Sequence, residues 1–440
     1  MKAKKIIGKV VLTVLAVLVL ACIVFCGIYF TRFQSIASLE KYTDYEDGYN
    51  LYSMDIKYDY SLDDIINSGY TDMQGLVDAI IDESLPLLPV SINVPSFGCS
   101  AFRTETVDKD ILMGRNYDFK LDTSALMVRC EPKDGYKSIA FAALNNISAD
   151  NADAGIAKKM ACLTAPFICL DGVNEKGVSI AVLTLPSDPT MHDTGKPKLA
   201  TSLLIRLVLD RAATTDEAPE LIEQYDIFSS NGRDYHFVIN DATGNSVAVE
   251  FDCEDPERKM VVTPTQAITN FFVMHIDKVD LNSDNGMYGT GKSRKRYEAM
   301  LDVLEDNENA VDMDVAWEAL RAAAQEPDPN DNRNDKITIT VLALILYGLI
   351  LLGVVFISYI GVKALFRNQD KKVEEILSSE ALKDSQSDYE ENEATVSANE
   401  EKSLATAEEK VSDSTTGHIV DSELYLSENS SFECVRSKSF

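Results

Sequence analysis

The sequence predicts an α+β domain that lies between two apolar segments, and three observations carry this prediction. Residues 100–113 and 235–251 each show two runs of strand-like alternation joined by a polar turn, which is typical of hairpins. Helical patterns fall between and after these hairpins. Uncharged apolar runs over 10–30 and 337–362 stand on either side. We therefore expect antiparallel sheet layers with helices packed outside them, over residues 99–325.

The expected elements follow one another without an internal repeat. Strands are expected where β-branched and apolar residues alternate, and helices where apolar residues recur every three or four positions. In chain order they are strands at 100–104, 111–113 and 178–183, helices at 203–208 and 215–225, strands at 235–239 and 247–251, and helices at 296–304 and 311–324. Residues 31–98 combine an acidic, tyrosine-rich stretch with one or two helical patterns and are too short to form a domain of their own.

The charge of the chain excludes one class of function and separates its regions. The 440 residues carry a formal net charge of -30, and no Lys/Arg cluster forms the basic patch that phosphate binding needs. Nucleic acid is therefore excluded as a partner. Residues 363–440 are acidic and poor in large apolar groups, which predicts a disordered tail. A polar linker, 326–336, precedes the second apolar run.

Both apolar runs are long enough to cross a bilayer, which takes about 20 apolar residues. Basic residues precede the first run within 1–9 and follow the second, so the positive-inside rule places both ends of the chain in the cytoplasm. The region between would then be extracytoplasmic at the cell membrane. A cleaved signal peptide is an alternative for residues 10–30, because the triplet 35–37 resembles a cleavage site. Residues 19–22 loosely resemble a lipoprotein signal.

The cysteines single out one candidate nucleophile. Cys130, Cys162, Cys169 and Cys253 lie in apolar, strand-like runs and are expected to be small buried hydrophobes. Cys99 instead follows a Ser-Phe-Gly breaker and begins a strand. No CxxC motif and no histidine at zinc-ligand spacing occurs, so we expect no metal site.

A reactive cysteine needs a base that produces its thiolate. No histidine pattern typical of papain-like enzymes surrounds Cys99. The alternative base is the α-amino group of the nucleophile itself, which titrates near pH 8 and becomes available when the residue is N-terminal. This hypothesis requires autocleavage between Gly98 and Cys99, which would make residues 31–98 a pro-segment. Gly98 has no side chain that would obstruct attack on its carbonyl.

Five motifs follow one another along the chain. They are Gly98-Cys99-Ser100-Ala101-Phe102, Gly114-Arg115-Asn116-Tyr117-Asp118-Phe119, Asp171-Gly172-Val173-Asn174-Glu175-Lys176-Gly177-Val178, Ala267-Ile268-Thr269-Asn270 and Arg296-Tyr297. In this order they resemble the choloylglycine hydrolase family of linear amide C–N hydrolases. These N-terminal nucleophile (Ntn) hydrolases include bile salt hydrolases and penicillin V acylases. The spacings of 16 residues from the cysteine to the arginine and 19 to the aspartate match the family. The resemblance covers about residues 40–325.

The resemblance implies a four-layer αββα sandwich, the Ntn hydrolase fold, that hydrolyses a non-peptide amide in a small N-acyl substrate. It implies that Cys99 is the nucleophile and its freed amine the base. Arg115 would favour the thiolate, and Asp118 would orient the amine. Asn270 would place the amine or the oxyanion, and Arg296 would stabilise the surroundings of the acyl-enzyme. No cofactor is expected.

Two features depart from the family. Bile salt hydrolases carry an oxyanion-hole asparagine where this chain has Thr184, whose hydroxyl or backbone N–H would have to serve. The family's final strands are not recognisable after Gln325. Because of these two departures, a catalytically inactive membrane sensor or binding protein with the same fold is the alternative function.

Arg294 is the alternative to Arg296 if the alignment shifts by two residues.

Overall fold

The structure of the chain is a computed structural model. It describes residues 2–87, 98–118, 123–283, 286–308, 310–324 and 432–437. All of the described strands belong to one compact unit, and the described residues before Val19 belong to another. The predicted linker 326–336, the predicted second span 337–362 and most of the predicted tail lie outside the described residues.

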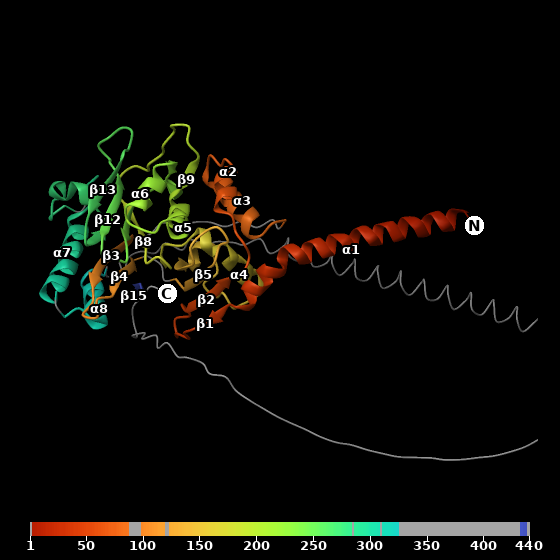
Figure 1. Cartoon of the computed structure of the whole chain (residues 1–440), viewed down its shortest axis with the longest axis horizontal. Helices are drawn as coiled ribbons and strands as arrows, with labels where there is room; N and C mark the ends of the chain where they lie inside the picture. Colours follow the sequence, from red (N-terminus) through yellow and green to blue (C-terminus); the bar gives the residue numbers. More distant parts are fainter. Residues whose placement is uncertain are drawn as a thin grey trace, which may run out of the picture. The chain divides into compact units, whose positions relative to one another are not determined.

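The larger sheet has nine strands in the order β1-β2-β5-β6-β7-β8-β11-β12-β13 (Figure 1). Their bounds are Glu40–Lys41, Leu51–Ile56, Ala125–Cys130, Ser138–Ala143, Asp171–Asn174, Ser179–Leu185, Asp234–Asn240, Ser246–Phe251 and Met260–Pro264. Neighbouring strands are antiparallel except β2 and β5, which are parallel. The predicted strand at 178–183 and the predicted hairpin at 235–251 are both present. Every residue of β8 and β11 is buried, because both faces of the sheet are covered at its centre.

The smaller sheet carries the region around Cys99. Its order is β14-β3-β4-β15, with bounds Ala267–Thr269, Gly98–Glu105, Ile111–Asp118 and Phe432–Ser437. The predicted hairpin is formed by β3 and β4, in which Gly98 opposes Asp118. Strand β14 pairs with the other edge of β3, with Thr269 opposite Ser100. This pairing brings the residue after β14, Asn270, to the start of β3. A short parallel pair, β9 (Lys198–Ala200) with β10 (Asp226–Phe228), completes the described strands.

A small buried core joins the two sheets. Its members come from β3, β4 and β14 on one side and from β8, β11 and β12 on the other, together with one residue after β14. They are Cys99, Ala101, Met113, Ala181, Leu183, Val238, Ala248, Ile268 and Val273. Side chains alternate between the faces of a strand, so Ile180 and Val182 of β8 point to the opposite face, into the larger core. The core between the sheets therefore contains the candidate nucleophile itself.

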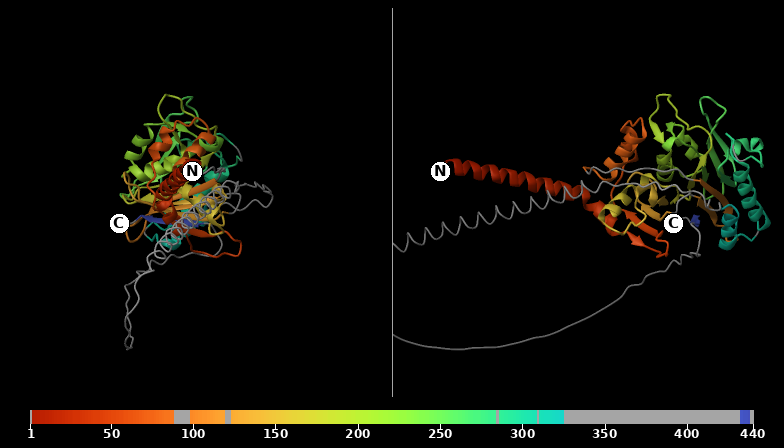
Figure 2. Two further views of the ribbon diagram at one scale, coloured as in Figure 1. Left: turned by 90° about the vertical axis from the view of Figure 1, so that its right-hand side faces the viewer. Right: turned by 180° about the vertical axis from the view of Figure 1, so that it is seen from behind.

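Helices cover the outer face of each sheet. Helices α7 (Gly291–Asp306) and α8 (Met313–Ala322) pack on Phe102 and Leu112 of the smaller sheet and lie beside the β3–β4 hairpin in Figures 1 and 2. Helix α5 (Thr201–Arg211) packs on the larger sheet. The remaining helices of the domain are α2 (Leu62–Asn67), α3 (Met73–Ser84), α4 (Ile156–Ala161) and α6 (Glu217–Ile222), with 3-10 segments Leu144–Ile147, Cys162–Phe167, Ser230–Gly232 and Val273–Lys278 (η1 to η4). The arrangement is a mixed α/β fold built on a large sheet.

The segment before Cys99 is an integral part of the larger core. Strand β2 is an internal strand of the sheet, and buried tyrosines connect the segment to later parts of the chain. The hydroxyl of Tyr58 donates to the carbonyl of Leu163 at 2.6 Å, and that of Tyr70 donates to the carbonyl of Lys198 at 2.9 Å. The region that the sequence predicts to be a pro-segment therefore contributes two strands, β1 and β2, and buried side chains to the domain.

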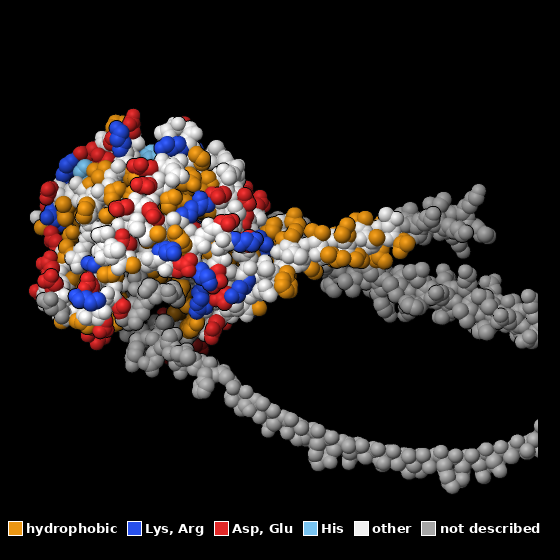
Figure 3. Space-filling model, viewed as in Figure 1, with side chains coloured by type: hydrophobic (Ala, Val, Ile, Leu, Met, Phe, Trp, Pro, Cys, Tyr) orange, Lys and Arg blue, Asp and Glu red, His pale blue; other side chains and the backbone are white. Residues whose placement is uncertain are grey.

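Helix α1 spans Lys2–Ala37, and its portion Leu12–Ala37 is long and apolar enough to cross a membrane by length and composition. A signal sequence near an N-terminus meets the same criteria. Figure 3 shows hydrophobic side chains along α1, whereas the visible face of the domain mixes acidic, basic and polar groups. Near its C-terminal end the helix joins the domain, where Arg32 donates to the carbonyls of Glu83 and Ser84 at 2.6 and 2.8 Å.

Strand β15 lies in the segment that the sequence predicts to be a disordered tail. It pairs antiparallel with β4, from Phe432 opposite Asn116 to Ser437 opposite Ile111. The backbone edge of β4 that faces away from β3 is thereby occupied, although no strand is recognisable in the sequence directly after residue 325.

Truncation of Met54 tests whether residues before Cys99 stabilise the domain. Met54 is fully buried in β2, so Met54→Ala is expected to lower the free energy of unfolding by about 2–5 kcal/mol. Urea unfolding of the detergent-solubilised chain measures this value. Lys57→Ala, at an exposed position next to the same strand, should leave it unchanged. Equal stability of the two variants would contradict the integration of this segment.

Candidate active site

Cys99 is the second residue of β3, and its side chain is fully buried between the two sheets. Its thiol sulfur accepts a hydrogen bond from Nη2 of Arg115 at 3.0 Å. Its backbone N–H donates to Oδ1 of Asn270 at 3.2 Å. The two atoms that an N-terminal cysteine nucleophile would use, Sγ and the α-nitrogen, thus each have a partner in the uncut chain.

Arg115, on β4, connects Cys99 to the larger sheet. Only 4% of its side chain is exposed. Nη1 forms an ion pair with Oδ2 of Asp171 at 3.0 Å, and Nη2 also donates to the carbonyl of Val182 at 3.3 Å. The guanidinium carbon lies 5.3 Å from the ring centroid of Tyr117, within cation–π range. The position of this cation is therefore fixed from several sides.

Arg296 approaches Cys99 from the opposite direction, on α7. Its Nη2 donates to the carbonyl oxygen of Cys99 at 3.2 Å and forms an ion pair with Asp118. Nη1 donates to Oδ1 of Asn270 at 3.2 Å, and Nε donates to the carbonyl of Ala323 at 2.7 Å. Helix α7 begins at the side-chain cap Thr290, so a capped first turn precedes this arginine.

Asn270 has both ends of its amide engaged. Oδ1 accepts from Cys99 and Arg296, while Nδ2 donates to the carbonyl of Thr184 at 2.9 Å and to its hydroxyl at 3.2 Å. Exchanging the oxygen and nitrogen would place donors against donors, so this network determines the orientation of the amide. Asn270 thus joins Cys99 to β8.

The structure brings together all the residues that the sequence singles out for the site. They are Gly98, Cys99, Arg115, Asp118, Thr184, Asn270 and Arg296. Arg294, the alternative to Arg296, is directed away from Cys99. Its guanidinium donates to the carbonyls of Ile276 and Val279, both at 3.0 Å, and pairs with Glu298.

Sequence reasoning overlooked the role of Asp171 as the partner of Arg115. This residue opens β7 and was recognised only as part of a glycine-containing motif. The same motif carries a turn, as Asn174 shows. Oδ1 of Asn174 accepts from the backbone N–H groups of Lys176 and Val178, each at 3.0 Å. Gly177 follows with φ +82°, a conformation that suits glycine. The signal that could have identified Asp171 is an acidic residue at the start of an otherwise apolar strand.

Burial controls the acid–base state of the site in the uncut chain. Burial raises the pKa of the Cys99 thiol to about 12, although the Arg115 guanidinium opposes this shift. Burial likewise raises the pKa of Asp171 to about 6 against the influence of Arg115. The thiol is therefore protonated at neutral pH, and a base or a change in solvent access is needed to form the thiolate.

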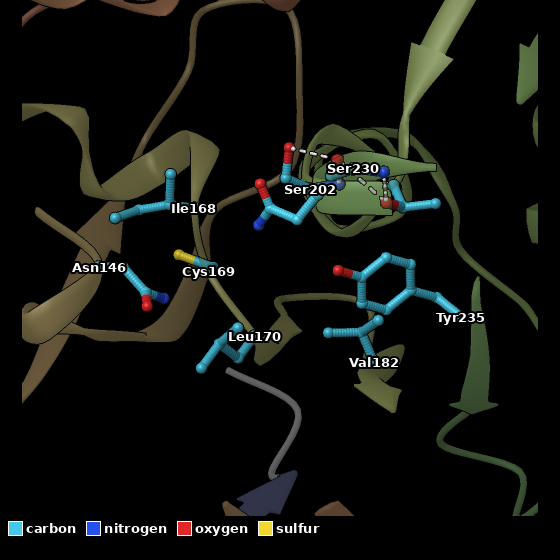
Figure 4. A pocket seen from close by; sticks show the side chains of 10 residues that line it. Asn146, Ile168, Cys169, Leu170, Val182, Ser202, Ser230 and Tyr235 are labelled. Atoms are coloured by element: carbon cyan, nitrogen blue, oxygen red, sulfur yellow. Dashed lines mark hydrogen bonds between the residues drawn. The ribbon is translucent and has the colours of Figure 1, made fainter. Parts of the chain in front are cut away.

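A small pocket lies beside the larger core, on the side of β8 to which Val182 points (Figure 4). Val182, whose carbonyl accepts from Arg115, is one of its lining residues, and Leu170, next to Asp171, is another. The other lining residues are Asn146, Ile168, Cys169, Thr201, Ser202, Ser230, Asn231 and Tyr235. In Figure 4 the apolar side chains of Leu170 and Val182 lie opposite the hydroxyl groups of Ser202 and Ser230.

Within the described residues, one group of side chains could hold a metal ion. The potential ligand atoms of Asp252, Cys253 and His275 lie within 4.8 Å of one another. Nε2 of His275 lies 2.9 Å from Oδ1 of Asp252, so these two side chains already satisfy each other. The group lies outside the set of residues that contact Cys99.

Removal of the charge on Asp171 tests the buried ion pair. Asp171→Asn leaves Arg115 without an opposite charge in the core, and is expected to lower the free energy of unfolding by about 3–5 kcal/mol. Urea unfolding of the full chain measures the change, with Asp188→Asn at an exposed position as the control. An unchanged unfolding midpoint for Asp171→Asn would refute the pairing.

One family model matches part of the chain. The family model of the linear amide C-N hydrolases, choloylglycine hydrolase family, matches residues 99–270. The match is narrower than the resemblance expected from the motifs, and it begins at Cys99 and ends at Asn270. A comparison with curated proteins finds no match.

Solved structures with some similarity include bile acid hydrolases and a penicillin acylase. Two variants of conjugated bile acid hydrolase from Clostridium perfringens are each 17% identical, with TM-scores of 0.37 and 0.38, and cover 55% of this chain and 83% of theirs. Penicillin V acylase from Agrobacterium tumefaciens is 16% identical, with a TM-score of 0.37, and the match covers 54% of this chain and 75% of that one. The family model thus identifies residues 99–270 as similar to the choloylglycine hydrolase family of linear amide C–N hydrolases.

Proposed function

We propose that this chain is a membrane-anchored, extracytoplasmic hydrolase of linear, non-peptide amide bonds, with Cys99 as its nucleophile after cleavage of the Gly98–Cys99 bond. One observation carries the proposal. Cys99 is the first residue of the family match, and its sulfur and α-nitrogen are held by Arg115 and Asn270 at 3.0 and 3.2 Å.

The first step is self-cleavage. The sulfur of Cys99 attacks the carbonyl carbon of Gly98, the peptide C–N bond breaks, and the released nitrogen takes up a proton. Water then hydrolyses the thioester to a Gly98 carboxylate and a free thiol. Because Gly98 opposes Asp118 in the hairpin, the new N-terminus forms beside a carboxylate that pairs with Arg296. An N-terminal ammonium or amine is well placed to hydrogen-bond there.

The freed amine then serves as the base for turnover. An α-amino group titrates near pH 8, so it accepts the thiol proton far more readily than bulk water does. The thiolate attacks the substrate carbonyl, the amine product leaves with a proton, and water hydrolyses the acyl-enzyme. The Arg115 cation, 3.0 Å from the sulfur, favours the thiolate. Its partner Asp171 keeps that cation oriented.

Thr184 and Asn270 are the candidates for stabilising the oxyanion. The amide nitrogen of Asn270 donates to both the carbonyl and the hydroxyl of Thr184 in the uncut chain. After cleavage, the Asn270 amide and the Thr184 hydroxyl would provide donors at the side of the reacting carbonyl. Loss of one oxyanion donor typically costs about 10²–10³ in rate, which sets the scale expected for either residue.

The αββα sandwich and the membrane location belong to the same proposal. Helices cover the outer faces of two sheets that share the core around Cys99, as an Ntn hydrolase requires. Leu12–Ala37 supplies an apolar helix of 26 residues for anchoring. Lysines within residues 1–9 favour a cytoplasmic N-terminus and an extracytoplasmic domain. The second span at 337–362 and the cytoplasmic tail stay predictions.

Self-cleavage and amide hydrolysis are tested together on the full chain. The wild-type chain should yield a fragment that begins with Cys99, which N-terminal sequencing and intact mass identify. It should also hydrolyse penicillin V or a conjugated bile acid, the substrates named for the similar enzymes. Cys99→Ala should abolish both activities, whereas Cys253→Ala, at a partly exposed thiol, should retain them. An uncut, inactive wild-type chain would favour the membrane sensor or binding protein instead.

Cleavage should produce two fragments that stay together. Strand β2, helices α2 and α3 and the tyrosines around them are buried against residues after Cys99. A tag at the N-terminus should therefore recover the cut 99–440 fragment in mild detergent, and urea should separate the two. Separation in mild detergent, with the catalytic fragment still folded, would contradict this prediction.

A further inference from the structure

Glu250 is a fully buried acidic residue that lies outside the set of predicted site residues. It stands on β12, one residue before the end of the strand. Its Oε1 accepts from the backbone N–H of Val273 and its Oε2 from that of Met274, both at 2.8 Å. A carboxylate that receives two consecutive backbone N–H groups holds that backbone in one position, because each group would otherwise be buried without a partner.

His236 fixes the carboxylate from the other side. It is fully buried on β11, and its Nδ1 lies 2.9 Å from Oε1 of Glu250. His236 opposes Leu183 of β8, so its side chain points into the core between the sheets that contains Cys99. Since a carboxylate only accepts, Nδ1 is the donor. We call Glu250, His236 and the N–H groups of Val273 and Met274 the Glu250 clamp.

The clamp acts on the backbone that carries Asn270. Only Phe271 and Phe272 separate Asn270 from Val273, and both are fully buried. The N–H of Phe271 donates to the carbonyl of Thr269, and that of Phe272 to the carbonyl of Tyr288, each at 2.7 Å. Every backbone N–H from 271 to 274 therefore has a partner, and the clamp provides the last two.

We propose that Glu250, oriented by His236, is a positioning residue that holds Asn270 against the α-nitrogen of Cys99. The inference rests on the proposed function, since that nitrogen is the one that self-cleavage releases. Glu250 does not touch Cys99. It acts through four residues of backbone, and a displacement of Asn270 by about 1 Å is enough to slow a positioned reaction about 10²-fold.

The first test compares self-cleavage rates in freshly synthesised full-length chain. Glu250→Gln can accept only through one oxygen, and its amide nitrogen opposes a backbone N–H, so cleavage should slow about 10²-fold. His236→Leu removes the donor and should slow cleavage as well. His236→Asn places an amide donor near the position of Nδ1 and should restore the rate. The matched control is Val249→Ala, at a fully buried neighbour in the larger core, which loses packing and leaves the clamp intact.

The second test reads the position of Asn270 without any chemistry. In a Cys99→Ala background the chain stays uncut, and the N–H of residue 99 still meets Asn270. Hydrogen exchange should become faster in Glu250→Gln at residues 271–274 and at residue 99, and should stay unchanged at residue 99 in Val249→Ala. Faster exchange at 271–274 alone would overturn the positioning role and leave a purely structural clamp.

The two tests separate the possible failures. If Glu250→Gln cleaves as fast as Val249→Ala at equal stability, the inference is wrong whatever the exchange shows. If the wild-type chain does not cleave at all, the proposed function fails, and the exchange at residue 99 alone decides whether Glu250 positions Asn270.

Discussion

The site depends on the contacts that the buried guanidinium of Arg115 makes. It stands on the smaller sheet and reaches the larger one at two strands, through Asp171 of β7 and the carbonyl of Val182 on β8. A cation at this depth is tolerated only when it is paired and hydrogen-bonded. The contacts that pair and hydrogen-bond this guanidinium also direct Nη2 toward the sulfur of Cys99. Stability and chemistry therefore impose the same geometry on this side chain.

Arg296 gives the site a second fixed cation with a different task. Arg115 donates to the sulfur of Cys99. Arg296 donates to the carbonyl of Cys99 and to the amide oxygen of Asn270, and it forms an ion pair with the carboxylate of Asp118. Cys99 thus lies between two guanidinium groups, each with its own carboxylate. The paired charges leave little net charge around Cys99, which is consistent with burial remaining the largest influence on its thiol. In the proposed mechanism, the base that forms the thiolate would be the amine that cleavage at Gly98–Cys99 releases.

The sequence predicts the site residues through short local motifs. The spacing of Cys99, Arg115 and Asp118 lies within one hairpin, so the sequence alone brings these residues together. Asp171 lies 56 residues after Arg115, and only the order of strands in two sheets makes them neighbours. Glu250 and His236 fall in apolar strands whose pattern predicts burial without indicating a partner. The segment before Cys99 was underestimated for the same reason, because β2 pairs with a strand that lies more than 60 residues away.

The pairing of strand β15 with β4 restricts where the chain can cross a membrane. Two strands that share backbone hydrogen bonds lie on the same side of any bilayer, so residues 432–437 and β4 occupy one compartment when they are paired. A chain that crosses a membrane once between residues 325 and 432 separates them. The pairing and a single crossing at 337–362 are therefore mutually exclusive, and the edge of β4 shows which of them the chain adopts. With the crossing, that edge is left open to the backbone of another chain.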